Sequence, residues 1–376
     1  MLKALQRSQV SVQALTRLAN VCLFLLASWV QPERLPLVAL QGVLLAVPYT
    51  LMEALIGRPL AAGIVPDRWD VEAWARRASA VVAVPVALAG YLTASVALPS
   101  TGVVDRLLLV APVVLQVPVE ALFWATTRSR SRSRANLIPQ LTAVGTVVAG
   151  VACAASGLRL EVAAGPAQLL VLAWVLTASG AGEKPGWGAA VRTGWVYAVT
   201  AAVDLSYTVA LPAVAGAVVG PAAIVALRGL DLAFGPFHVA LSAGTREDLV
   251  AGRQARWATG TRALTVALLV AVSAAVLASD DVRGLLAADL AALATGAVAL
   301  YCAYKCLLML STWLATRHMI SAAPRRFLVS AVGSRVIAFA AVAVAVATVT
   351  GVTGLFLLLM VAEAAVAAWY AVRLRT

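Results

Sequence analysis

The chain has 376 residues, of which 62% are hydrophobic and only 12% are charged, and its mean hydropathy is +0.92. This composition excludes a soluble domain and is typical of a membrane protein with many spans. The formal charge of +12 would suggest nucleic acid as the partner of a soluble protein. Here the basic residues stand in short loops, so we expect no nucleic-acid partner. The excess of Arg over Lys, with abundant Ala, Val and Leu, favours a GC-rich bacterial source.

Apolar windows of roughly 20 residues predict about twelve transmembrane helices. The predicted spans, in chain order, are 10–30, 35–56, 79–98, 104–126, 136–156, 162–181, 190–214, 219–242, 262–279, 285–314, 328–349 and 352–372. The even number and the basic N-terminus place both chain ends in the cytoplasm. The first span has no cleavage site after it and is expected to remain as an anchor.

The loops between these spans alternate in charge. The loops and chain ends on the inner side carry 21 Lys and Arg residues, whereas the outer loops carry four: Arg34, Arg106, Arg159 and Arg283. Such alternation follows the positive-inside rule. It predicts a multi-pass protein of the bacterial cytoplasmic (inner) membrane, with both termini inside.

A short internal repeat divides the chain into halves. The sequence VALQG at 38–42 matches VALRG at 225–229, an offset of 187 residues (225 − 38), and Pro48 then falls beside Pro236. A looser counterpart relates 104–107 to 281–285, in the same order. Two halves of the same orientation form a parallel repeat, which places a substrate path between them. We therefore predict an N-terminal six-helix lobe at 1–185 and a C-terminal six-helix lobe at 186–376.

Motifs of enzymes are missing from the sequence. It contains no P-loop, no HExxH and no Gly-x-Ser-x-Gly, and only two histidines, His238 and His318. His318 is expected in a solvated loop, and His238 near a helix end. The four cysteines lack metal-site spacing, so we expect no metal, no cofactor and no enzymatic activity.

Charged residues inside the predicted spans are the candidate functional residues, because a charge at bilayer depth usually faces a wet cavity or a partner. The hairpin 189–242 carries three of them, and Arg228 is expected to pair with Asp231 or with Asp204. The candidates for binding an anionic head group are Arg17, Asn20, Arg228 and Lys305. The candidates for ion coupling or cavity ion pairs are Glu120, Asp204, Asp231 and Glu363.

Four stretches with charged residues in or next to predicted spans follow one another along the chain: Gln13–Asn20, Leu55–Leu60, Val113–Glu120 and Arg228–Pro236. Their order along nearly the whole chain resembles the multidrug/oligosaccharidyl-lipid/polysaccharide (MOP) exporter superfamily, in particular its Wzx-like O-antigen and teichoic-acid flippase branch. The resemblance implies an all-α, MATE/MurJ-like fold of two lobes around a V-shaped cavity, which works by alternating access. It also implies that cationic cavity residues hold a lipid pyrophosphate, a role that we carry to Arg17 and Arg228. Lys305 is added because of its depth in the membrane.

The function expected from these observations is a flippase. It would move a polyprenyl-pyrophosphate-linked oligosaccharide from the cytoplasmic to the outer leaflet, with membrane lipids and polysaccharide polymerases or glycosyltransferases as expected partners. A cation-coupled exporter of drugs or small molecules with the same fold remains an alternative, as does a non-catalytic scaffold of a polysaccharide assembly machine. A major-facilitator protein is disfavoured because Pro66–Trp69 lacks that family's loop signature, and a membrane glycosyltransferase because the predicted outer loops are short.

Overall fold

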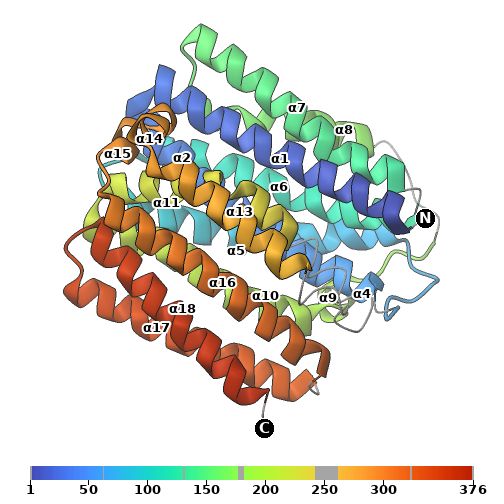
Figure 1. The fold of residues 1–376 in the computed structure, drawn as a ribbon. Helices are drawn as coiled ribbons and strands as arrows, with labels where there is room; N and C mark the ends of the chain where they lie inside the picture. Colours follow the sequence, from blue (N-terminus) through green and yellow to red (C-terminus); the bar gives the residue numbers. More distant parts are fainter. Residues whose placement is uncertain are drawn as a thin grey trace. The chain divides into compact units, whose positions relative to one another are not determined.

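The computed structural model describes residues 2–61, 63–129, 132–176, 182–241, 261–321 and 324–374, and within these ranges the chain is almost entirely helical (Figure 1). The loop arginines Arg130, Arg246, Arg253 and Arg256 lie outside the described residues. The chain forms two compact units, which are described separately. The N-terminal unit comprises Leu15–Ala213, and the C-terminal unit comprises Val214–Thr376 together with Met1–Ala14.

The N-terminal unit contains the helices that correspond to the first seven predicted spans. Its elements are α1 (Leu2–Val30), the 3₁₀ turn η1 (Pro32–Arg34), α2 (Leu35–Leu44), α3 (Ala46–Met52), the π-helix η2 (Glu53–Gly57), α4 (Arg58–Ala61), α5 (Val71–Ala97), α6 (Val103–Ser129), α7 (Arg132–Ser156), η3 (Leu160–Val162), α8 (Ala164–Leu176), α9 (Trp187–Arg192) and α10 (Trp195–Val214). Asp70 caps α5, because its carboxylate accepts hydrogen bonds from the backbone N–H groups of Glu72 and Ala73, both at 3.0 Å. Helix α6 packs against α5, α7 and α8 and forms the centre of this unit.

The C-terminal unit contains the remaining spans. Its elements are the π-helix η4 (Ala215–Val219), α11 (Pro221–Ala233), the helix Gly235–Leu241, α13 (Thr261–Ala278), α14 (Asp280–Leu286), α15 (Ala288–Ala291), α16 (Thr295–Ser321), α17 (Pro324–Thr348) and α18 (Val352–Arg373). Gly220 has φ 109°, which permits the turn into α11. Helix α18 lies alongside α16 and α17, as the red and orange ribbons of Figure 1 show.

The apolar helices coincide with the predicted spans. Among the described residues, eight helices are long and apolar enough to cross a membrane, or nine if Pro221–Ala233 and Gly235–Leu241 count as one bent span. Shorter apolar helices occupy the other three predicted spans, at Ala14–Val30, Leu160–Trp174 and Ala267–Ala278. The chain is therefore an all-α, multi-pass membrane protein, as predicted.

Two predicted helices differ from those observed. The span 219–242 is not one helix, because the chain bends by 64° between Ala233 and Gly235. The prediction of a long helix over 285–314 was also wrong: Ala287 is extended (φ −165°, ψ 145°), so α14 ends before it and α16 begins only at Thr295. Helix α16 then continues to Ser321, and it contains His318, which was expected in a solvated loop.

The units part between residues 213 and 214, inside the hairpin 189–242, whereas the repeat places the lobe boundary at 185/186. The units are defined by packing and the lobes by sequence similarity, so the lobe boundary stays a prediction. The prolines that the repeat relates differ in their surroundings. Pro236 follows the 64° bend at Phe234, whereas Pro48 follows only a local turn at Leu45, whose backbone stays helical (φ −62°, ψ −17°) within one apolar span.

Two arginines provide a structural counterpart of the repeat. Arg106, near the start of α6, donates to the Pro99 carbonyl just after α5 at 2.9 Å. Arg283, in α14, donates to the Leu277 carbonyl at the end of α13 at 2.7 Å. In both units an arginine thus holds the end of the preceding helix, at the positions that the sequence repeat relates to each other.

Candidate functional site

A cluster of charged side chains in the C-terminal unit combines three of the predicted candidates. Arg228 and Asp231 lie one turn apart on α11, and Arg228 Nη1 is 3.5 Å from Asp231 Oδ2. Lys305 reaches the same carboxylate from α16, with its Nζ 2.6 Å from Asp231 Oδ1. The predicted pairing of Arg228 with Asp231 is therefore present, and Lys305 is a second cation on the same acid.

His238 joins this cluster because the chain bends after α11. Its Nε2 lies 2.9 Å from Asp231 Oδ1 and 3.1 Å from Lys305 Nζ. A straight helix would place residue 238 about two turns beyond residue 231 along the axis, out of reach of a direct contact. The 64° bend therefore positions this histidine at the site.

Tyrosine rings cover the ammonium group of Lys305. Its Nζ lies 5.1 Å from the centre of the Tyr301 ring and 5.3 Å from that of Tyr304, within the range of cation–π attraction. The Tyr301 hydroxyl is also 3.5 Å from Asp231 Oδ1. The rings replace part of the hydration that the buried ammonium loses.

The members of the cluster differ in exposure. The side chains of Arg228 and Lys305 are 6% and 4% exposed, whereas those of Asp231 and His238 are 25% and 17% exposed. The carboxylate and the imidazole are therefore more accessible than the two cations. With His238 neutral, the cluster carries one net positive charge.

The other predicted site residues belong to other elements of the chain. Arg17, Asn20, Glu120 and Asp204 belong to the N-terminal unit, where Arg17 and Asn20 are partly buried on α1. Glu363 is in the C-terminal unit, buried on α18, and it accepts a hydrogen bond from the Ser311 hydroxyl of α16. Its local role is to link two packed helices.

In the N-terminal unit, Glu120 takes part in a hydrogen-bond network with two glutamine side chains. Gln116 Nε2 donates to Glu120 Oε1 at 2.8 Å, and Gln168 Nε2 donates to Gln116 Oε1 at 2.7 Å. Gln168 also donates to the Pro112 carbonyl at 2.9 Å. Gln116, one turn before Glu120 on α6, is thus bonded to it, and Gln168 on α8 adds a third side chain to the network.

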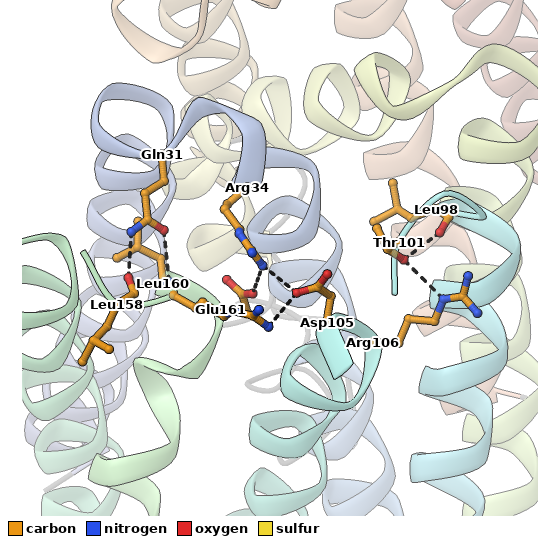
Figure 2. Close-up of polar contacts among 10 residues, drawn as sticks. Gln31, Arg34, Leu98, Thr101, Asp105, Arg106, Leu158, Leu160 and Glu161 are labelled. Atoms are coloured by element: carbon orange, nitrogen blue, oxygen red, sulfur yellow. Dashed lines mark hydrogen bonds and ion pairs between the residues drawn. The ribbon is translucent and has the colours of Figure 1, made fainter. Parts of the chain in front are cut away.

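A second charged cluster was not predicted. Figure 2 shows Arg34 pointing between Asp105 and Glu161, and Arg34 Nη1 lies 2.7 Å from an oxygen of each. Arg159 Nη1 is also 2.7 Å from Asp105 Oδ1. These contacts join η1, the start of α6 and η3. The only signal in the sequence was that three consecutive outer loops each contain a charged residue next to a span.

Among the residues that the structure describes, no three His, Cys, Asp or Glu side chains come together as they would around a metal ion. Cys22, Cys153, Cys302 and Cys306 are free thiols.

Comparison with known proteins was informative only at the level of structure. No family model and no curated protein matches the sequence. Among solved structures, an inward-facing multidrug resistance MATE family transporter of the MOP superfamily matches with a TM-score of 0.64 at 14% identity, covering 98% of both chains. Lipid II flippase MurJ in an inward closed conformation matches with a TM-score of 0.67 at 10% identity, covering 98% of this chain and 87% of that one. The eukaryotic MATE transporter AtDTX14 matches with a TM-score of 0.65 at 15% identity, covering 98% of this chain and 94% of that one.

The chain has the fold of the MOP superfamily transporters. The predicted MATE/MurJ-like fold and the resemblance to this superfamily are thereby confirmed at the level of structure. Both MATE transporters and a flippase share the MOP fold with this chain, so the likeness does not select the Wzx-like branch.

Proposed function

We propose that this protein is a transporter that flips a polyprenyl-pyrophosphate-linked oligosaccharide from the cytoplasmic to the outer leaflet by alternating access. The observation that carries the proposal is the pair of buried cations, Arg228 and Lys305, which share a single carboxylate. Guanidinium and ammonium groups are the side chains that bind phosphate oxygens most strongly. A cluster with net positive charge favours a diphosphate over a cationic or neutral solute.

The fold and the hydropathy support the same function. The matched MurJ structure is described as a lipid II flippase, which shows that the MOP fold accommodates lipid-linked substrates. The lipid tail of such a substrate stays in the bilayer while its head group enters the protein. We place the protein in the bacterial cytoplasmic membrane with both termini inside, with Arg17 and Asn20 contributing to head-group binding. Enzymes that assemble or transfer the polysaccharide are the proposed partners.

A leaflet assay tests this function. In a strain that lacks the protein, we expect polyprenyl-linked sugar to accumulate on the cytoplasmic face, and wild-type protein to relieve the accumulation. Arg228→Gln and Lys305→Met should slow flipping by about tenfold or more, because each removes a charge-assisted contact. Arg317→Gln is the matched control, since Arg317 is an exposed cation on the same helix as Lys305. Normal flipping by both cluster variants would contradict the proposed site.

Export of a cation is the second candidate function, and one observation favours it. Asp231 is the most exposed member of the cluster, so a carboxylate is the first charged group that a solute meets. In this case the strain lacking the protein would trap no polyprenyl-linked sugar. It would instead retain a cationic dye, and Asp231→Asn or Asp204→Asn would abolish dye efflux.

A further inference from the structure

We propose that the Asp231 carboxylate occupies the place of the substrate's negative charge between Arg228 and Lys305, so that head-group binding is linked to the uptake of one proton by Asp231. This inference rests on the proposed function and adds to it how the site is controlled. It makes Asp231 an internal competitor of the anionic ligand.

The contacts of Asp231 are the basis of this competition. Asp231 uses both carboxylate oxygens, one toward Arg228 and the other toward Lys305, and these are the two cations that a diphosphate would need. The carboxylate is also more exposed than either of them. A diphosphate that approaches an ionised Asp231 meets a like charge in a poorly hydrated environment, where repulsion is stronger than in water.

His238 gives the protonated acid a partner. Once protonated, Asp231 can donate a hydrogen bond from Oδ1 to His238 Nε2, which lies 2.9 Å away, when the imidazole carries its proton on Nδ1. The carboxyl then no longer holds the Lys305 ammonium, which becomes available to a phosphate oxygen. Protonation thus breaks the ion pair between Lys305 and Asp231 and allows an ion pair between Lys305 and a phosphate of the ligand.

The surroundings contribute few other titratable groups. Helix α16 contributes Tyr301, Tyr304 and Lys305, and the helix after α11 contributes His238. On α18, Glu363 accepts a hydrogen bond from Ser311. Arg335 of α17 and Lys305 both attract this carboxylate electrostatically. From α13, Ser273 bonds the Ala233 carbonyl, and from α15, Leu290 packs at Gly229. Asp231 is the carboxylate that contacts both Arg228 and Lys305.

Calorimetry on the purified full-length protein in detergent micelles tests the inference, with farnesyl pyrophosphate as the probe. Titrations in buffers of different ionisation enthalpy count the protons exchanged on binding. The phosphates of the probe lose protons on entering a cationic site, so net proton uptake must come from the protein. We expect uptake by the wild type and an affinity that falls by about tenfold per pH unit above neutrality, as one linked proton requires.

Two variants show whether Asp231 or His238 accepts this proton. Asp231→Asn should bind the probe about tenfold tighter at neutral pH, because the like charge is gone, and it should take up no proton. Uptake that persists in Asp231→Asn and disappears in His238→Gln would overturn the inference, because the histidine would then be the acceptor. If Asp231→Asn fails to fold, net proton release by the wild type overturns it equally.

The outcome also distinguishes this inference from the proposed function. Binding that Arg228→Gln and Lys305→Met abolish, but that shows no proton uptake, refutes the competition and leaves the head-group site in place. Absence of binding by the wild type refutes both.

Discussion

Arg283→Met is the substitution whose cost the structure defines best. Arg283 is 1% exposed and donates to three backbone carbonyls, those of Leu277, Leu290 and Leu293, at 2.7, 3.1 and 3.0 Å, and it also pairs with Asp280. Methionine keeps most of the apolar stem but removes every donor. Each buried carbonyl that loses its partner costs about 1 kcal/mol or more, so we expect a loss of about 3 kcal/mol in the free energy of unfolding.

Reversible unfolding by SDS in mixed micelles, followed by tryptophan fluorescence, measures this loss. Arg106→Met is the matched control, because Arg106 occupies the related position of the other unit but holds only one carbonyl, that of Pro99, and is partly exposed. We expect it to cost about 1 kcal/mol. Equal losses for the two variants, or a loss below about 1 kcal/mol for Arg283→Met, would refute the reasoning that carbonyl capping holds α13 to α15.

Two further substitutions test packing and charge in the N-terminal unit. Gly194→Ala would place its new methyl group inside van der Waals contact of the Leu55 backbone carbonyl, which cannot rotate away, so we expect a loss of about 1–3 kcal/mol. Gly188→Ala, with open space around it, should leave the free energy of unfolding unchanged or slightly raised. Asp105→Asn should cost about 1–3 kcal/mol, because it leaves two arginines without their shared carboxylate. Asp67→Asn breaks only the exposed pair with Arg128 and should cost less than about 1 kcal/mol. The same SDS titration reads all four, and a Gly188→Ala loss equal to that of Gly194→Ala, or equal losses at Asp105 and Asp67, would contradict these assignments.

Patterns along the chain predicted the features that depend on local spacing. Hydropathy located each apolar helix, and the spacing of Arg228 and Asp231 predicted their ion pair, because residues three apart share a helix face. The bend after Ala233 was missed, since Phe234 and Gly235 stand in an apolar run that is compatible with a continuous helix. The spacing placed His238 close to the helix face of Arg228 and Asp231, but its direct contact with Asp231 depends on the bend and was not predicted.

Contacts between distant segments could not be predicted in this way. Lys305 was recognised from its depth, but 74 residues separate it from Asp231, and one sequence carries no signal for that pairing. The cluster of Arg34, Asp105 and Glu161 was missed for the same reason, because its members come from three different loops. His318 was misplaced because its helix extends past the apolar window that was used to set its end.

The related positions Gln41 and Arg228 distinguish the two halves of the chain. Both are buried at the same place in the repeat, but Gln41 donates to the carbonyls of Leu109 and Glu161, at 2.9 and 2.6 Å, and so ties neighbouring segments together. At the related place in the other half, Arg228 pairs with Asp231 and, in the proposed function, meets the head group. The two halves therefore hold different chemistry at one position of the repeat, a neutral amide that links segments of the scaffold and a charge at the proposed site. Arg228→Gln gives the second half the side chain that the first already has there.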